Sequence, residues 1–439
     1  MSEEAKQVPT VQTEEHTEVK VESKSETATP VQSEKNQVAE KETLEPCHKT
    51  EIRNLGGFTD YYVKYGQTLD VTIPVADLFK NNSFPTGVVV EYNDDSRKKF
   101  TPEEEKSRDK LFDTKVKALR RGAEVHRQVR AYAQSIIKPG IKLWDLCNAI
   151  EDRVRLLIGE SGPQAGCGFP CGVSINSCAA HYTPNPGDET VLKYGDVMKV
   201  DFGVQYHGWI IDCAFTSCFD PEKDNLVLAT KEATYKGLAM AGPDQLLGEI
   251  GAEIEEIISS YEVTIDGKVY RCKPVRNLSG HSMDQGTIHA GKSVPLVKEE
   301  GGPRMEEGEV FAIETFATTG NGYIVEGGET SHYARMAGVN APIRLPSAQK
   351  LLKHINKTFG TIPFCRRYLS RNDGGSYAIN GNKGKQTKYL ASLKCLCDNG
   401  IVHAYPPLTD RSGSYISQWE HTVILKSNGK EIVSKGDDY

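Results

Sequence analysis

An internal duplication constrains the fold of this chain more strongly than any other feature of its sequence. A turn that begins with proline and leads into an amphipathic helix occurs twice, at a separation of 104 residues. The apolar helix positions are Leu143, Leu146, Ile150 and Val154 after Pro139, and Leu247, Ile250, Ile254 and Ile258 after Pro243. This period is too long for a solenoid, so the sequence predicts one domain made of two similar halves.

Each copy continues into a strand that ends in a carboxylate. Residues 195–201 (GDVMKVD) match residues 308–314 (GEVFAIE) at a shift of 113. In the first copy, strands over 197–206 and 209–219 are predicted to form a hairpin. The two halves are therefore expected to place carboxylates at equivalent positions.

The hairpin loop decides whether Asp201 and Asp212 share one face of the sheet. A two-residue loop puts them on the same face, directly opposite for a loop at 206–207 and diagonally for a loop at 207–208. A three-residue loop would put them on opposite faces. The sequence leaves these alternatives open.

The second copy supplies two further carboxylates. Glu314 lies in the apolar run 310–316, and Glu420 precedes the apolar run 422–425. The run 422–425 is predicted to be the hairpin partner of the run 310–316. The long gap between these runs predicts an insertion. Leu351, Leu352 and Ile355, followed by the stretch from Tyr389 to Leu396, give that insertion a helical pattern.

Carboxylates on apolar strands need a cation, a shared proton or a pair of bases, because burying a bare negative charge is costly. Lys199 is the only basic residue that alternates with Asp201 and Asp212 on the first pair of strands. Each residue alone would be read as a surface or hydrogen-bonded polar group, but the duplication favours a metal. The turn at 280–282 offers His281 as a neutral ligand. The predicted ligands are Asp201, Asp212, His281, Glu314 and Glu420.

Oxygen-rich ligands with one imidazole favour hard or borderline divalent ions, and carboxylates can bridge two such ions roughly 3.5 to 4 Å apart. Manganese, cobalt, iron and zinc all fit this set. The sequence therefore predicts two divalent metal ions per chain and leaves their identity open.

The net charge of −7 is concentrated in one segment. Residues 1–46 hold eleven Glu and five Lys, which gives −6, and they include no aromatic residue. Such a segment is predicted to be disordered, and a solvating tail is favoured over a tether for a partner such as the translation machinery. The remainder is almost neutral, which argues against direct binding of nucleic acid.

The N-terminus lacks the pattern of a signal peptide, and no apolar run is long enough to span a membrane, so we expect a cytoplasmic protein without a membrane partner. The eleven cysteines are scattered, as is typical of reduced cytosolic thiols. The predicted segments are a disordered acidic tail (1–52), an N-terminal extension (53–100), the catalytic domain (101–330), a helical insertion (331–405) and C-terminal strands that complete the catalytic domain (406–439).

Several motifs together resemble type 2 methionine aminopeptidases, over the chain from about Thr101 to its C-terminus. They are residues 168–170, NSCAAHYTP at 176–184, KVDFG at 199–203, IDCAFT at 211–216, NLSGHS at 277–282, IHAGK at 288–292, 312–316 and EHT at 420–422. The resemblance includes the insertion that distinguishes type 2 from type 1. It implies an α+β pita-bread fold with two pseudo-symmetric halves around a dinuclear metal site.

The resemblance also implies a function, namely removal of the initiator methionine from nascent proteins, with a preference for small second residues. By residue matching, His181, His289 and Glu314 are the expected catalytic residues, and His332 is a further pocket residue. Phe169, Ile288 and Tyr405 match positions that line the methionine pocket. The family favours a monomer.

Three alternatives remain open at the level of sequence. One is a proline-specific peptidase of the same fold, although such relatives carry a larger N-terminal domain. Another is a non-catalytic pita-bread protein that binds RNA or protein, although such relatives lose metal ligands. The third adds a role in protecting an initiation factor. Because the tail lacks the long lysine blocks of some family members, ribosome or initiation-factor contact cannot be carried over from them.

Overall fold

The computed structural model describes residues 62–92, 101–370 and 383–439, which all belong to one compact unit, residues 46–439. The predicted disordered tail, residues 1–52, lies outside the described residues. Within the described ranges, no helix combines the length and the apolar character that crossing a membrane would require.

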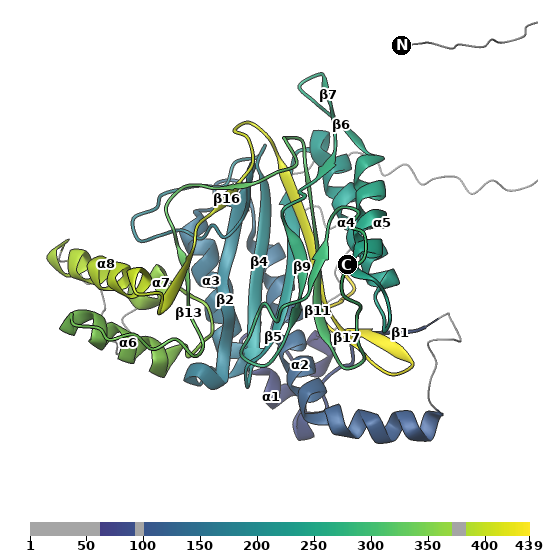
Figure 1. Ribbon diagram of the computed structural model, residues 1–439, viewed down its shortest axis with the longest axis horizontal. Helices are drawn as coiled ribbons and strands as arrows, with labels where there is room; N and C mark the ends of the chain where they lie inside the picture. The colour runs from purple at the N-terminus through teal and green to yellow at the C-terminus, as the bar shows by residue number, and fades with distance from the viewer. Residues whose placement is uncertain (1–61, 93–100, 371–382) are drawn as a thin grey trace, which may run out of the picture. The chain divides into compact units, whose positions relative to one another are not determined.

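The first half consists of two helices and an antiparallel sheet in the order β2-β4-β5 (Figure 1). Its elements are α2 (Pro102–Ile136), α3 (Leu143–Ile158), β2 (Ala165–Ile175), β4 (Val197–Tyr206) and β5 (Trp209–Cys218). Helix α2 begins at a capping box, in which the Thr101 hydroxyl accepts from the Glu104 backbone N–H at 3.4 Å and the Glu104 carboxylate accepts from the Thr101 N–H at 2.8 Å. The sequence pattern at 101–104 thus fixes where the first long helix starts.

The second half repeats this plan. Its main elements are α4 (Asp224–Met240), α5 (Leu247–Ser259), β9 (Ser279–Met283), β11 (Val310–Thr318) and β17 (Ile416–Leu425). The sheet runs in the order β1-β18-β17-β11-β9-β10, and β8 also pairs with β11. Its remaining strands are β1 (Val88–Glu91), β8 (Lys273–Pro274), β10 (Ser293–Pro295) and β18 (Gly429–Ile432). The predicted duplication is therefore present in three dimensions.

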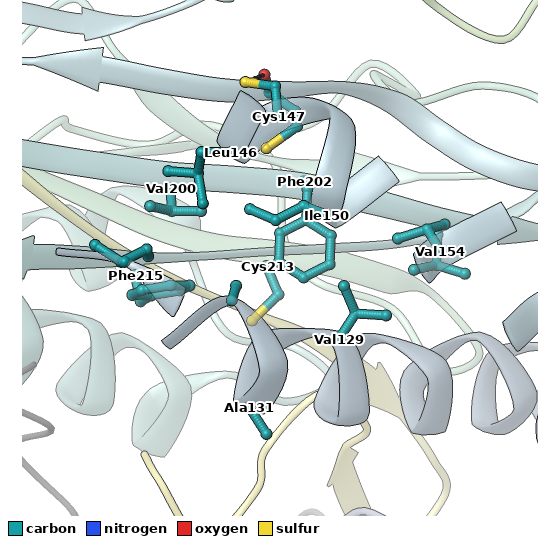
Figure 2. Packing of buried hydrophobic residues seen from close by; sticks show 14 of the residues in the cluster. Val129, Ala131, Leu146, Cys147, Ile150, Val154, Val200, Phe202, Cys213 and Phe215 are labelled. Carbon is teal, nitrogen blue, oxygen red and sulfur yellow. Dashed lines mark hydrogen bonds between the residues drawn. The ribbon is translucent and has the colours of Figure 1, made fainter. Parts of the chain in front are cut away.

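Both amphipathic helices bury the predicted apolar stripes. Figure 2 shows Leu146, Ile150 and Val154 of α3 facing the core beside Phe202 of β4. The equivalent α5 residues lie in a second core with Phe311 and Ile313 of β11. All eight stripe residues are at most 1% exposed. Burial of each side chain contributes about 1.5 to 3 kcal/mol to folding, so these stripes hold the helices against the sheets.

The two sheets meet where β5 runs beside β17 (Figure 1). Threonine hydroxyls join the two strands. The Thr422 hydroxyl donates to the Asp212 carbonyl at 2.7 Å and accepts from the Asp212 N–H at 2.9 Å. The Thr216 hydroxyl makes the corresponding pair of bonds to the Gln418 backbone, at 2.7 and 2.9 Å. The seam between the halves therefore runs through the backbone of Asp212, which is a predicted ligand, and of Gln418, two residues before the predicted ligand Glu420.

The predicted helical insertion contains strands as well as helices. Its elements are β13 (His332–Arg335), α6 (Pro346–Thr358), β14 (Phe364–Cys365), α7 (Arg366–Ser370), α8 (Lys383–Asp398) and β15 (Val402–Tyr405), with strand order β14-β13-β15. Leu351, Ile355, Phe364 and Leu393 form part of its own apolar core. The remaining short elements are α1 (Val75–Leu78), β3 (Cys178–Ala180), β6 (Glu262–Ile265), β7 (Lys268–Arg271), β12 (Val325–Glu326) and β16 (Leu408–Thr409).

Candidate metal centre and active site

Strand register brings the four predicted carboxylates together. The β4–β5 loop is His207-Gly208, both with positive φ (52° and 82°), and Tyr206 pairs with Trp209. Asp212 therefore lies opposite Gly203 rather than Asp201, and the two carboxylates are diagonal neighbours on one face. In the second half, Glu314 and Glu420 lie directly opposite each other in the β11–β17 pair.

His281 of β9 completes the cluster. Its Nε2 atom is 3.5 Å from Asp212 Oδ2 and 3.8 Å from Glu314 Oε1. Ligand atoms of Asp212, His281 and Glu420 all lie within 4.8 Å of one another. The five predicted ligands thus come from five strands, two in the first half and three in the second.

Burial strongly shifts the pKa values of the ionisable side chains in this cluster. Burial, together with the neighbouring Asp212 carboxylate, raises the pKa of Asp201 to about 8. Burial also raises the pKa of Asp212 to about 7 and raises the pKa values of Glu314 and Glu420 well above the ordinary value. Burial lowers the pKa of His281 to about 4, so this imidazole is neutral and able to ligate.

Within the described part of the chain, no Lys or Arg forms an ion pair with these carboxylates. Lys199 is fully buried on β4, but its ammonium group donates to the Asn176 carbonyl at 2.9 Å and the Val197 carbonyl at 3.3 Å. Asp201 Oδ1 is buried without a hydrogen-bond partner among the described residues. A set of four carboxylates and one neutral imidazole therefore fits divalent cation binding.

Gln418 is a site residue that sequence reasoning missed. Its Nε2 atom donates to Glu314 at 3.1 Å, to Asp201 at 3.2 Å and, at the longer distance of 3.5 Å, to Glu420. Gln418 precedes Glu420 by two residues, so both side chains lie on the same face of β17. That two-residue spacing is the signal that could have identified it.

Metal-depleted protein is expected to release at least about one proton in total when it takes up divalent cations at pH 7. The reason is that Asp201 and Asp212 have pKa values of about 8 and about 7 before the cation binds. Because the cation binds the ionised carboxylates, its apparent affinity should increase as the pH rises from about 6 to about 8. Calorimetric titration in two buffers with different ionisation enthalpies measures the proton count, and identical heats in both buffers would contradict it.

One cavity of about 360 Å³ is lined by every site residue that the sequence analysis predicted. These residues are Phe169, His181, Asp201, Asp212, His281, Ile288, His289, Glu314, His332, Tyr405 and Glu420. A second cavity, of about 430 Å³, lies between α3, β2 and α6 and is lined by none of them. The carboxylate cluster therefore opens into a chamber that also holds the predicted substrate-contacting residues.

The histidines occupy distinct parts of this cavity. His289 lies at its exposed rim, and its ring meets the His281 ring edge-on at 4.4 Å between centroids. His181 follows β3 with a positive φ of 63°, and its ring lies 5.9 Å from the His332 ring and 5.7 Å from the Tyr405 ring. His332 and Tyr405 are opposite each other on β13 and β15, so the insertion supplies one wall of the cavity.

Comparison with known proteins agrees with this geometry. Residues 117–340 match metallopeptidase family M24. The chain is 52% identical over 374 residues to methionine aminopeptidase 2-1 of Talaromyces stipitatus, covering 84% of this chain and 82% of the relative. It is 50% identical over 374 residues to methionine aminopeptidase 2A of Arabidopsis thaliana, covering 85% and 82%.

Among solved structures, a thermophilic Arx1 superposes with a TM-score of 0.58 at 19% identity, covering 71% of this chain and 88% of that one, which is a likeness of fold. The duplicated fold, the buried ligand set and the family match define a metallopeptidase with the pita-bread fold. Within that class, the chain belongs to the methionine aminopeptidase family, in the group whose curated members are named methionine aminopeptidase 2. The resemblance predicted from the motifs is confirmed.

Proposed function

We propose that this protein removes the initiator methionine from nascent polypeptides by hydrolysing their first peptide bond. The observation that carries this proposal is the complete cavity: all five candidate metal ligands and all six other predicted site residues line one space. Membership in the methionine aminopeptidase family supports the same reaction and the same substrate end. We also propose that the enzyme acts in the cytoplasm as a monomer.

We assign two divalent cations, of manganese, cobalt, iron or zinc, to Asp201, Asp212, His281, Glu314 and Glu420. When bound, such ions polarise the scissile carbonyl and lower the pKa of a water molecule. Glu314 would accept the proton of the attacking water, because its carboxylate lines the cavity from β11. The same carboxyl group can pass this proton to the leaving amine.

His181 and His289 are assigned to substrate contact. Burial lowers the pKa of His181 to about 4, and the neighbouring His289 also contributes, so the His181 ring is neutral and carries one N–H donor. Its Nδ1 atom has no hydrogen-bond partner among the described residues. We assign this unpaired Nδ1 atom to the scissile amide, and His289 to the developing negative charge on the carbonyl oxygen.

The methionine side chain is assigned to the apolar side of the cavity. Phe169, Ile288 and Tyr405 provide contacts suited to an unbranched, polarizable thioether, and His332 borders the same wall. We further propose a preference for small second residues. A series of Met-Xaa peptides in which Xaa increases in size tests it, and equal rates across the series would remove that part of the proposal.

Metal-depleted protein reconstituted with manganese, cobalt, iron or zinc is expected to release methionine from a Met-Gly-type peptide, whereas the depleted protein should release none. The reason is that the only ion-pair partner of Asp212 and Glu314 among the described residues is His281, whose imidazole is neutral, so the cluster needs a cation to act. Absence of release with every metal would refute the peptidase proposal. Faster cleavage of Xaa-Pro than of Met-Gly peptides would instead identify a proline-specific enzyme of the same fold.

A further inference from the structure

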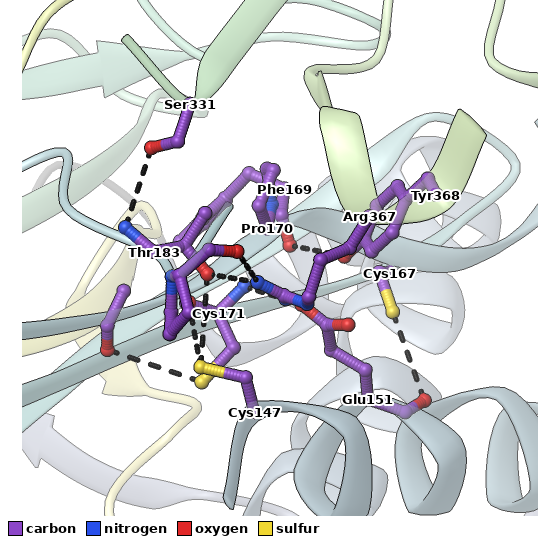
Figure 3. A network of polar contacts seen from close by, with 12 residues as sticks. Cys147, Glu151, Cys167, Phe169, Pro170, Cys171, Thr183, Ser331, Arg367 and Tyr368 are labelled. Atoms are coloured by element: carbon purple, nitrogen blue, oxygen red, sulfur yellow. Dashed lines mark hydrogen bonds and ion pairs between the residues drawn. The ribbon is translucent and has the colours of Figure 1, made fainter. Parts of the chain in front are cut away.

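A buried ion pair connects the insertion to the first half of the catalytic domain. Arg367 of α7 pairs with Glu151 of α3, and both side chains are only 1% exposed. Figure 3 shows this pair at the centre of a polar network just behind Phe169 and Pro170. Buried ion pairs are weak evidence for stability, so the placement of this one calls for another explanation.

The pair makes hydrogen bonds to two separate segments of backbone. The Arg367 guanidinium donates to the Thr183 hydroxyl and to the Pro184 carbonyl, the latter at 3.3 Å. The Glu151 carboxylate also accepts from the Cys171 N–H at 3.0 Å. One side of the network thus holds the segment that follows His181, and the other holds β2 next to Phe169.

Regular strand pairing does not fully fix the backbone of β2 near Phe169 or the backbone at His181. The β2–β4 register shifts between Cys167 and Phe169 and again between Phe169 and Gly172. His181 has a positive φ of 63°, which a residue with a side chain adopts only when its surroundings impose it. Ser331 adds support from the insertion, since its hydroxyl accepts from the Thr183 N–H at 3.3 Å and lies 3.2 Å from the His181 carbonyl.

We propose that Arg367 and Glu151 are positioning residues, which fix the His181 imidazole and the Phe169 wall in the geometry that the substrate requires. The forked guanidinium reaches the Thr183 hydroxyl and the Glu151 carboxylate at once, which a single ammonium group does poorly. The insertion then serves the chemistry as well as covering the site. This inference rests on the proposed function, because it needs His181 to contact the substrate.

Thr183 provides the sharpest test, because it lies outside the set of residues that line the active-site cavity and receives the Arg367 bond directly. Thr183→Val keeps the shape and removes the acceptor. It is expected to lower kcat by about tenfold or more while KM changes less than about twofold, because His181 acts mainly in the transition state. Thr183→Ser restores the hydroxyl and should restore kcat to near the wild-type value.

A matched pair of arginine variants separates positioning from general stability. Arg367→Lys keeps the charge but loses the fork, and should lower kcat with wild-type metal content and a folded far-UV spectrum. Arg366→Lys changes the adjacent residue, whose partner is the largely exposed Glu329, and should leave kcat unchanged.

The possible outcomes distinguish failure of the positioning role from failure of the proposed peptidase function. Wild-type release of methionine together with a Thr183→Val variant of unchanged kcat would overturn the positioning role and leave the peptidase intact. Equal losses in Arg366→Lys and Arg367→Lys, in proportion to lowered melting temperatures, would also overturn it. Wild-type protein that releases no methionine with any metal would overturn both proposals.

Discussion

Replacing Glu314 by Gln is expected to lower methionine release by about 10²- to 10⁴-fold, the usual effect of losing a positioned proton acceptor. Glutamine keeps the size of the side chain and one carbonyl oxygen, so it can still approach a cation, but it cannot accept a proton. Glu314 lies opposite Glu420 in the β11–β17 pair, and the Gln418 side-chain amide donates to the Glu314 carboxylate at 3.1 Å. Peptide hydrolysis measured at saturating metal isolates the proton-transfer role from metal loss.

Two comparisons make this result interpretable. Glu314→Ala removes a metal ligand as well as the proton acceptor, so it should lose at least as much activity and also bind less metal. Glu326→Gln, at an exposed position on β12, should behave as wild type. Should Glu314→Gln retain more than about a tenth of the wild-type kcat at full metal content, another residue would be the proton acceptor.

Replacing His181 by Ala is expected to lower turnover by about ten- to ten-thousand-fold while metal content stays normal, on the usual magnitudes for acid–base and oxyanion contacts. His181 lines the cavity, but it is absent from the cluster of Asp212, His281 and Glu420 that could hold a metal. Elemental analysis of the purified variant, alongside steady-state kinetics on a Met-Gly-type peptide, measures both quantities. Loss of metal in this variant would make His181 a ligand and withdraw its assignment to substrate.

His403→Ala is the matched control for the His181 variant. His403 is exposed on β15, its ring lies 4.5 Å from the Tyr405 ring, and it does not line the cavity. A fall in activity in both variants would point to a disturbed Tyr405 wall, whereas a fall confined to the His181 variant supports direct contact with substrate.

The sequence predicts the duplicated core well because its signals are local and repeated. Helical spacing at 143–154 and again at 247–258 marks α3 and α5, and alternating strands mark β4 and β5. The loop at His207-Gly208 could not be chosen beforehand, because the sequence alone allows several hairpin registers. In the structure this loop has two residues, and both have positive φ.

Contacts between distant segments are harder to predict. Gln418 touches carboxylates from both halves, yet a lone Gln in a strand resembles any other polar residue. Arg367 and Glu151 are 216 positions apart, and each belongs to a helix whose pattern suggests no partner. The strands of the insertion are two to four residues long, too short for a clear alternation, so only its helices were predicted.

The seam between β5 and β17 has a consequence for how long the protein survives in a cell. Asp201 and Asp212 come from one half, and His281, Glu314 and Glu420 come from the other, so the proposed cations would hold the two halves together. Ligand binding to the folded state alone adds free energy by mass action, about 2.7 kcal/mol at a hundredfold excess over Kd. Metal scarcity would then shorten the protein's lifetime by allowing the halves to part and be digested, and abundance as well as catalytic rate would follow the metal supply.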